Sequence, residues 1–212
     1  MPLQPFDGNT FVAFTDISGF KEMMKDGNRA SKAMSRLYSS AYDALRDNPA
    51  VNGLFISDCG IMFSRGDSPA QKLSAMLQVV KRINESLLEH SIMLTTSIAW
   101  GHFSYHDRIE FDGIEKNPIY GSGYLSAFMD NETGKPKIKP GECRILKNSM
   151  TELPETDQEL FLQESTTHYQ YFWNVRSPDD IEGFKRRYKD SYSLKYAGML
   201  SALRGENVRE NE

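Results

Sequence analysis

Two short apolar runs, at 54–56 and 61–63, are separated by only four polar or small residues, at 57–60. Apolar runs this close together predict a β-hairpin with a polar tip. The hairpin falls within a chain whose patterns otherwise alternate between strand and helix. A hairpin in that position favours an α+β fold, in which helices pack on an antiparallel-rich sheet.

The other elements follow from the spacing of apolar residues. Spacing of three to four predicts a helix, whereas a short apolar run or strict alternation predicts a strand. Helices are predicted at 20–46 with an interruption at Gly27-Asn28, at 69–90, at 124–130 and at 180–203. Strands are predicted at 10–15, at 91–101 or 91–105, at 142–146 and at 169–175, and 110–120 is predicted to be a strand or a loop.

Size and charge limit the class of protein. A chain of 212 residues can bury about 70% of its extended surface, so it needs no disulfide or structural zinc. We expect one domain at 1–150 and, at 151–212, a strand and helix that extend the same domain. The net charge of −4 argues against nucleic acid as a partner, because binding to phosphates needs an excess of basic residues.

The sequence carries no pattern typical of export or of a membrane span. Residues 1–8 lack the apolar region of a signal peptide, and no run approaches the roughly 18 apolar residues that a span needs. Cys59 and Cys143 lack the spacing of metal ligands. These features predict a cytoplasmic protein with reduced thiols and no membrane partner.

Two aspartates stand at the ends of predicted strands. Asp16 ends the first strand and precedes a glycine-containing turn, and Asp58 lies at the tip of the hairpin. Adjacent strand ends can bring two carboxylates within a few ångströms, where they repel unless a cation lies between them. Mg²⁺ and Mn²⁺ take oxygen ligands of this kind together with substrate phosphates. A helix that begins just after Asp16 adds N–H groups suited to an anion.

The same two positions also fit a purely structural role. An aspartate before a helix is a common N-cap, and an aspartate at a hairpin tip is a common turn residue. Spacing alone leaves both interpretations open.

Longer segments resemble the class III nucleotidyl cyclases. The segment FTDISGF at 14–20 resembles their Phe-x-Asp-Ile-x-Gly-Phe motif, and ISD at 56–58 resembles their Ile-Gly-Asp motif with Ser57 in place of glycine. Weaker likenesses follow in the expected order, in TSIAWG at 96–101, IYG at 119–121 and YLSAF at 124–128. The likeness covers about residues 9–146 and implies the cyclase fold, with its ferredoxin-like core.

This resemblance implies a metal-dependent ring closure. Asp16 and Asp58 would be catalytic and would hold two Mn²⁺ or Mg²⁺ ions, with the carbonyl of Ile17 assisting. The ribose 3′-oxygen of a nucleoside triphosphate would attack the α-phosphorus, and pyrophosphate would leave. In the family a second subunit completes the site, so a head-to-tail homodimer is expected. The β- and γ-phosphates would lie against the backbone of Gly19, Phe20 and Lys21.

Several positions depart from the purine cyclases. Leu54 stands where their purine-reading lysine would be, and Pro118 stands where a polar base reader would be. Leu125 and Met129 occupy the places of the asparagine and arginine that stabilise the transition state. Three explanations are open: a non-catalytic module for nucleotide binding or dimerisation, one half of a heterodimer, or a branch that acts on pyrimidines.

We favour the pyrimidine branch, because a non-catalytic relative need not keep both metal-binding acids. The segments at 127–132 and 135–138 also resemble the Pycsar-type cyclases of bacterial anti-phage defence. This resemblance implies conversion of UTP, or of CTP, to a 3′,5′-cyclic monophosphate that a downstream effector senses. The substrate would lie near Leu54 and Ser57, in addition to 19–21. A purine cyclase remains an alternative.

Overall fold

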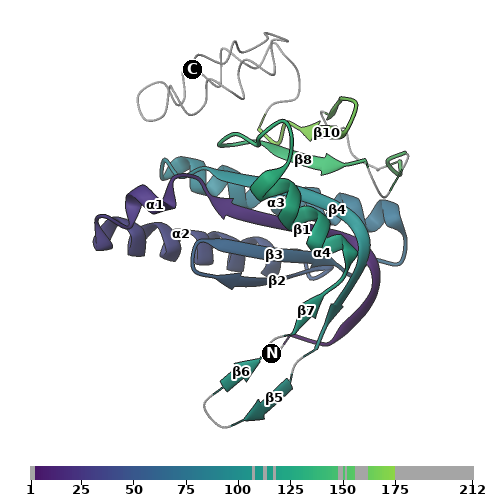
Figure 1. Ribbon diagram of the computed structural model, residues 1–212, viewed down its shortest axis with the longest axis horizontal. Helices are drawn as coiled ribbons and strands as arrows, with labels where there is room; N and C mark the ends of the chain where they lie inside the picture. Colours follow the sequence, from purple (N-terminus) through teal and green to yellow (C-terminus); the bar gives the residue numbers. More distant parts are fainter. Residues whose placement is uncertain are drawn as a thin grey trace.

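The fold was analysed in a computed structural model, which describes residues 3–106, 108–111, 114–116, 118–147, 150, 152–155 and 162–174. An eight-stranded mixed sheet lies at its centre (Figure 1). The strand order is β2-β3-β1-β4-β8-β10-β9, and β7 pairs with β4 beside this path. The sheet strands are β1 (Phe6–Ile17), β2 (Val51–Ile56), β3 (Cys59–Ser64), β4 (Leu94–Tyr105), β7 (Ile119–Tyr120), β8 (Cys143–Leu146), β9 (Leu162–Glu164) and β10 (His168–Tyr171).

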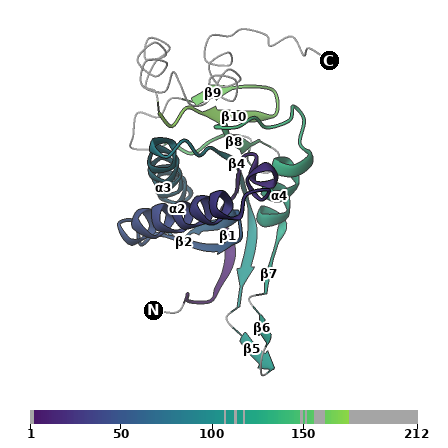
Figure 2. The same ribbon diagram turned by 90° about the vertical axis from the view of Figure 1, so that its left-hand side faces the viewer.

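Helices cover both faces of this sheet. The helices are α1 (Phe20–Met23), α2 (Gly27–Arg46), α3 (Pro69–Glu89) and α4 (Ser122–Thr133). Figure 2 shows α2 and α3 on one face and α4 on the other. Side chains alternate between the faces of a strand, and β1 shows this directly: Phe11 and Ala13 pack with the α2–α3 core, whereas Val12 and Phe14 pack with the α4 side. The predicted α+β fold with helices packed on an antiparallel-rich sheet is therefore confirmed. Among the strands in the described ranges, only β4 and β8 pair in parallel.

Local signals explain where the two long helices begin. Ser68 and Gln71 form a reciprocal capping box at the start of α3, with Pro69 in the first turn. The side chain of Asp26 accepts hydrogen bonds from the backbone N–H groups of Asn28 and Arg29 and so caps α2. An interruption of the helix is therefore present, but it lies at 24–26 and not at the predicted Gly27-Asn28, which are the first two residues of α2 because Asp26 caps the helix just before them.

Several boundaries differ from the sequence-based expectation. β1 begins at Phe6 because its polar first residues pair with β4, from Phe6 opposite Tyr105 onward. β4 begins at Leu94, because Ser91 and Ile92 donate hydrogen bonds back to the end of α3. The region at 110–120 contains parts of three strands: β5 (Arg108–Phe111) and β6 (Ile114–Lys116) pair with each other, and β7 joins β4.

The strands that follow 150 continue the sheet from β8. β10 pairs with β8, β9 pairs with β10, and Trp173 donates a hydrogen bond to the carbonyl of Gly141 at 3.0 Å. The helix predicted at 180–203 and the domain extension beyond 174 lie outside the described residues. None of the helices in the described ranges is long and apolar enough to cross a membrane.

Candidate active site

Asp16 and Asp58 lie side by side at the ends of neighbouring strands. Asp16 is the next-to-last residue of β1 and stands opposite Cys59 in the antiparallel β1–β3 ladder. Asp58 is in the two-residue turn between β2 and β3, and its carbonyl accepts a hydrogen bond of 3.0 Å from the N–H of Ile17. By the alternation of β1, the Asp16 side chain lies on the sheet face that α4 covers.

The electrostatics of the pair are unfavourable without a cation. Burial raises the pKa of the Asp16 carboxyl, and the charge and hydrogen bond of Asp58 raise it further, to about 7. The charge of Glu132 adds a smaller increase, which a backbone hydrogen bond at Ile17 partly offsets. Two carboxyl groups this close cannot both be ionised without repulsion.

The donor set of this pair fits a hard divalent cation. Within the described ranges, neither carboxylate forms an ion pair with a lysine, arginine or histidine. The described residues also contain no cluster of three or more His, Cys, Asp or Glu side chains arranged to hold a metal. Mg²⁺ is commonly held by one or two carboxylates, with water and substrate phosphates as its other ligands. Asp16 and Asp58 match that requirement.

A tight turn connects Asp16 to α1. Gly19 adopts a left-handed conformation with φ 76°, which a residue with a side chain adopts only under strain. The N–H of Ser18 is tied to the carbonyl of Met93 at 2.8 Å. The first N–H groups of a helix have no acceptor within it, so those of Phe20 and Lys21 remain available to an anion. The side chain of Phe20 is buried in the core, whereas that of Lys21 is exposed.

The other two predicted substrate residues lie on the hairpin that carries Asp58. Leu54 stands opposite Ile61 in the β2–β3 ladder and packs against the apolar cluster on the α4 side of the sheet. Ser57 is exposed, with φ 56°, and its carbonyl accepts a hydrogen bond of 2.9 Å from the hydroxyl of Tyr38. Leu54 thus shares the sheet face of Asp16, and Ser57 adjoins Asp58 in the turn.

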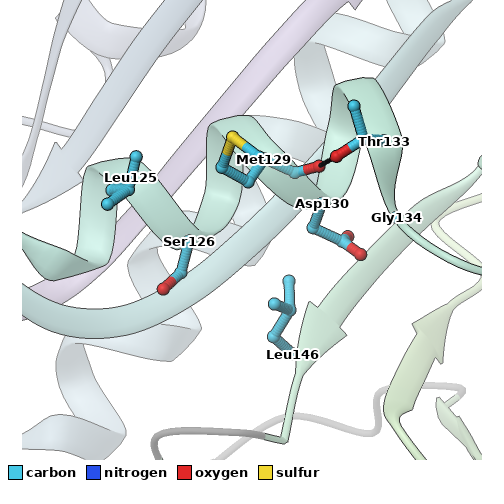
Figure 3. Close-up of a pocket in the computed structure, with 7 residues that line it drawn as sticks. All are labelled: Leu125, Ser126, Met129, Asp130, Thr133, Gly134 and Leu146. Carbon is cyan, nitrogen blue, oxygen red and sulfur yellow. Dashed lines mark hydrogen bonds between the residues drawn. The ribbon is translucent and has the colours of Figure 1, made fainter.

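Helix α4 presents apolar side chains at the positions that correspond, by the resemblance, to the transition-state asparagine and arginine of the purine cyclases. Leu125 and Met129 are 58% and 46% exposed. They line a cavity of about 360 Å³ between the outer side of α4 and the end of β8 (Figure 3). Asp130 extends from the same helix toward β8 in this view. Leu125 and Met129 are four residues apart on the helix and so are neighbours on its surface, where together they form a small exposed apolar patch.

The sequence analysis used the segment at 127–132 only as a resemblance and assigned no role to the polar residues at the end of α4. Asp130 is buried and accepts hydrogen bonds from Arg144, His168 and Ser97. The next residue, Asn131, accepts a hydrogen bond of 3.0 Å from Thr95. Glu132 contributes to the raised pKa of Asp16. The signal was available, because acidic residues in the last turn of a helix oppose its dipole and need another reason to be there.

Comparisons with known proteins support the fold. No family model matches the chain, and no curated protein matches it. Among solved structures, the chain is similar to the adenylyl cyclase CyaB from P. aeruginosa, with 13% identity, 82% of this chain and 98% of that chain covered, and a TM-score of 0.60. A dimeric guanylyl cyclase domain of the RhoGC fusion protein from Blastocladiella emersonii gives 13% identity, coverage of 80% and 96%, and a TM-score of 0.62.

A third similar structure contains a bound nucleotide. The guanylate cyclase domain of RhGC from Catenaria anguillulae, in complex with GTP, gives 13% identity, coverage of 80% and 98%, and a TM-score of 0.59. These likenesses show that the chain has the fold of nucleotidyl cyclase catalytic domains.

Proposed function

We propose that this protein is a nucleotide cyclase that depends on divalent metal and acts on a pyrimidine nucleoside triphosphate. The observation that carries the proposal is the pair of carboxylates, Asp16 and Asp58, at adjoining strand ends with the pKa of Asp16 raised to about 7. A repelling pair is costly to fold, so its presence at the start of a helix is best explained by a cation and an anionic substrate.

In this reaction the 3′-oxygen of the ribose attacks the α-phosphorus of the substrate. The bond between the α-phosphorus and its bridging oxygen breaks, pyrophosphate leaves with the electron pair, and the hydroxyl proton passes to water. Asp16 and Asp58 would hold the metal, with the Ile17 carbonyl assisting, and the backbone N–H groups of residues 19–21 would orient the β- and γ-phosphates. Divalent ions held there supply the positive charge that favours an ionised 3′-oxygen and offsets the charge on the triphosphate.

The preference for pyrimidines follows from the apolar character of Leu54. A purine-reading lysine at this position would form hydrogen bonds to the base edge, whereas leucine offers shape alone. A smaller base read by backbone groups or water suits such a surface. We favour UTP over CTP as the substrate, and a cyclic nucleotide messenger in anti-phage defence as the role.

The decisive experiment incubates the full-length protein with ATP, GTP, CTP or UTP and Mn²⁺, and identifies the products by mass spectrometry. We expect cyclic UMP or cyclic CMP together with pyrophosphate. Failure of all four nucleotides to give a cyclic product would refute the cyclase proposal. Cyclic AMP or cyclic GMP as the main product would refute only the pyrimidine preference.

Matched variants test the two acids. Asp16→Ala and Asp58→Ala should each lower turnover by at least about 100-fold, because a charge-assisted metal contact is lost. Asp67→Ala is the control, since Asp67 is an exposed acid outside this site. Near-normal turnover in either site variant would contradict the assignment of the acids.

A second candidate function is a nucleotide-binding or dimerisation module without catalysis. Leu125 and Met129 favour it, because neither side chain can donate a hydrogen bond to a phosphate. This alternative predicts triphosphate binding, or none, without release of pyrophosphate from any nucleotide.

A further inference from the structure

A second cavity lies on the opposite side of the sheet from the acids. It has a volume of about 260 Å³ and is lined by residues of α1, α2 and the segment that follows α3. Its floor is apolar and buried, formed by Met23, Ala33 and Ile92. Its rim carries the side chains Arg29, Lys32, Arg36 and His90. Figure 2 shows α2 and α3 side by side on this face.

The three cationic side chains on the rim come from one face of α2. Their spacing of three and four residues places them as neighbours on the helix surface, where like charges repel. Within the described ranges, Arg29, Lys32 and Arg36 form no ion pair. The first turn of α2 contains no acidic residue. The N-cap Asp26 accepts a hydrogen bond from the backbone N–H of Arg29 and offsets part of this charge, so the three cations form a partly compensated positive cluster on a protein whose net charge is −4.

We infer that this cavity binds a small free phosphate-bearing anion, either phosphate or pyrophosphate. Guanidinium groups bind phosphate oxygens in pairs, and an imidazole adds a further donor. The volume is below the roughly 300–1,000 Å³ of sites for larger organic ligands, so a phosphate or pyrophosphate fits better than a whole nucleotide. This site is separate from the proposed active site and does not depend on the cyclase activity.

The cavity adjoins the turn that follows Asp16. Met23 belongs to α1, which begins directly after Gly19. Ile92 precedes Met93, whose carbonyl accepts the hydrogen bond from Ser18 at 2.8 Å. An anion bound in the cavity would lie beside Met23 and Ile92, which adjoin the two segments that hold this turn.

The test measures binding of phosphate and pyrophosphate to the full-length protein by isothermal titration calorimetry in the presence of EDTA. Without divalent metal, the carboxylate pair repels anions, so the cavity dominates binding. The Arg29→Gln/Arg36→Gln variant should bind about 100-fold more weakly, because two charge-assisted hydrogen bonds are lost. Its melting temperature without phosphate should match that of the wild type, which shows that the variant folds.

Two controls make the result specific. Arg46→Gln/Arg82→Gln removes the same charge from arginines that pair with Asp47 away from the cavity, and it should bind like the wild type. Asp16→Asn/Asp58→Asn should not weaken the binding, because it removes only carboxylates that repel anions at the active site. The inference would be overturned if the wild type showed no saturable binding, or if it bound only to vesicles with phosphorylated headgroups. It would also be overturned if the Arg46/Arg82 control or the Asp16/Asp58 variant lost as much affinity as the cavity variant.

Discussion

Asp16 is held in the folded protein at a cost in stability when no metal is bound. Its pKa is raised from 3.8 to about 7, so between these values the folded state keeps a proton that the unfolded state loses. Stability contributed by this group is therefore fully present below about pH 4 and is lost as the pH rises toward 7. An acid kept in such a place is typical of a functional site.

This cost predicts a stabilising substitution. In metal-free protein, Asp16→Asn should raise the melting temperature relative to the wild type, and the difference should be larger at about pH 8 than at about pH 5. Thermal unfolding followed by circular dichroism at both pH values measures it. Asp67→Asn should show no such pH-dependent difference. An Asp16→Asn variant that is less stable than the wild type at pH 8 would contradict the repulsion.

The pKa of the buried Asp130 carboxyl is shifted in the opposite direction to that of Asp16. Burial raises its pKa, but hydrogen bonds from His168, Arg144 and Ser97 together hold the pKa below its ordinary value. The side chains of Asp130 and Arg144 are each only 5% exposed. These contacts fix the end of α4 to β4, β8 and β10.

Removal of Arg144 should therefore leave the buried Asp130 carboxylate with only His168 and Ser97 as side-chain donors among the described residues. Arg144→Met should lower the free energy of unfolding by about 3–5 kcal/mol, measured by urea denaturation. Lys147→Met is the control, because the Lys147–Glu164 pair is more exposed and should cost less than about 1 kcal/mol. Equal losses in the two variants would show that burial of the Asp130–Arg144 pair does not determine its contribution.

At the scale of elements, a helix or strand could be predicted from sequence when the interactions that define it are between residues close together in the chain. The hairpin and α3 could be predicted, because alternation, capping residues and a turn are local signals. The start of β1 could not, since its polar residues form a strand only because β4 supplies hydrogen bonds. β9 is three residues long and exists as a partner of β10, so no local pattern indicates it.

The close approach of α4 to β4 depends on a glycine in β4. A Cβ atom at Gly101 would lie 2.7 Å from the backbone nitrogen of Gly123, so any side chain there pushes α4 outward. Gly101→Ala should lower the free energy of unfolding by about 1–3 kcal/mol and should reduce turnover. Gly27→Ala is the matched control, because a Cβ there meets nothing within 4 Å. Urea denaturation of both variants measures the difference, and equal stability would contradict this packing argument.

At the scale of the whole molecule, the sheet separates two regions with opposite charge. Asp16 and Asp58 lie at strand ends on the side of α4, and the cationic cavity lies on the side of α2. The acids could be found from sequence because each stands at the end of a recognisable strand. The acids at the end of α4 gave a signal, but the partners of Asp130 could not be predicted, because they come from three separate strands. The basic residues of α2 lie on one helix, but the cavity beside them also needs Met23 and Ile92 from other parts of the chain.

The exposed apolar residues of α4 predict that two copies of the chain associate. Leu125 and Met129 are on the outer side of the helix that covers the Asp16 face, and a partner there would remove them from water. Leu125→Glu/Met129→Glu should shift the protein from dimer to monomer in sedimentation equilibrium and should lower turnover at low protein concentration. Tyr42→Glu changes another exposed residue, on α2, and should leave the dimer intact.

If the α4 variant remained a dimer, or if the wild type were a monomer at all concentrations, this face would not be the interface. Turnover that rises again with protein concentration in the Leu125→Glu/Met129→Glu variant would separate loss of the dimer from a direct effect of the new carboxylates on the triphosphate.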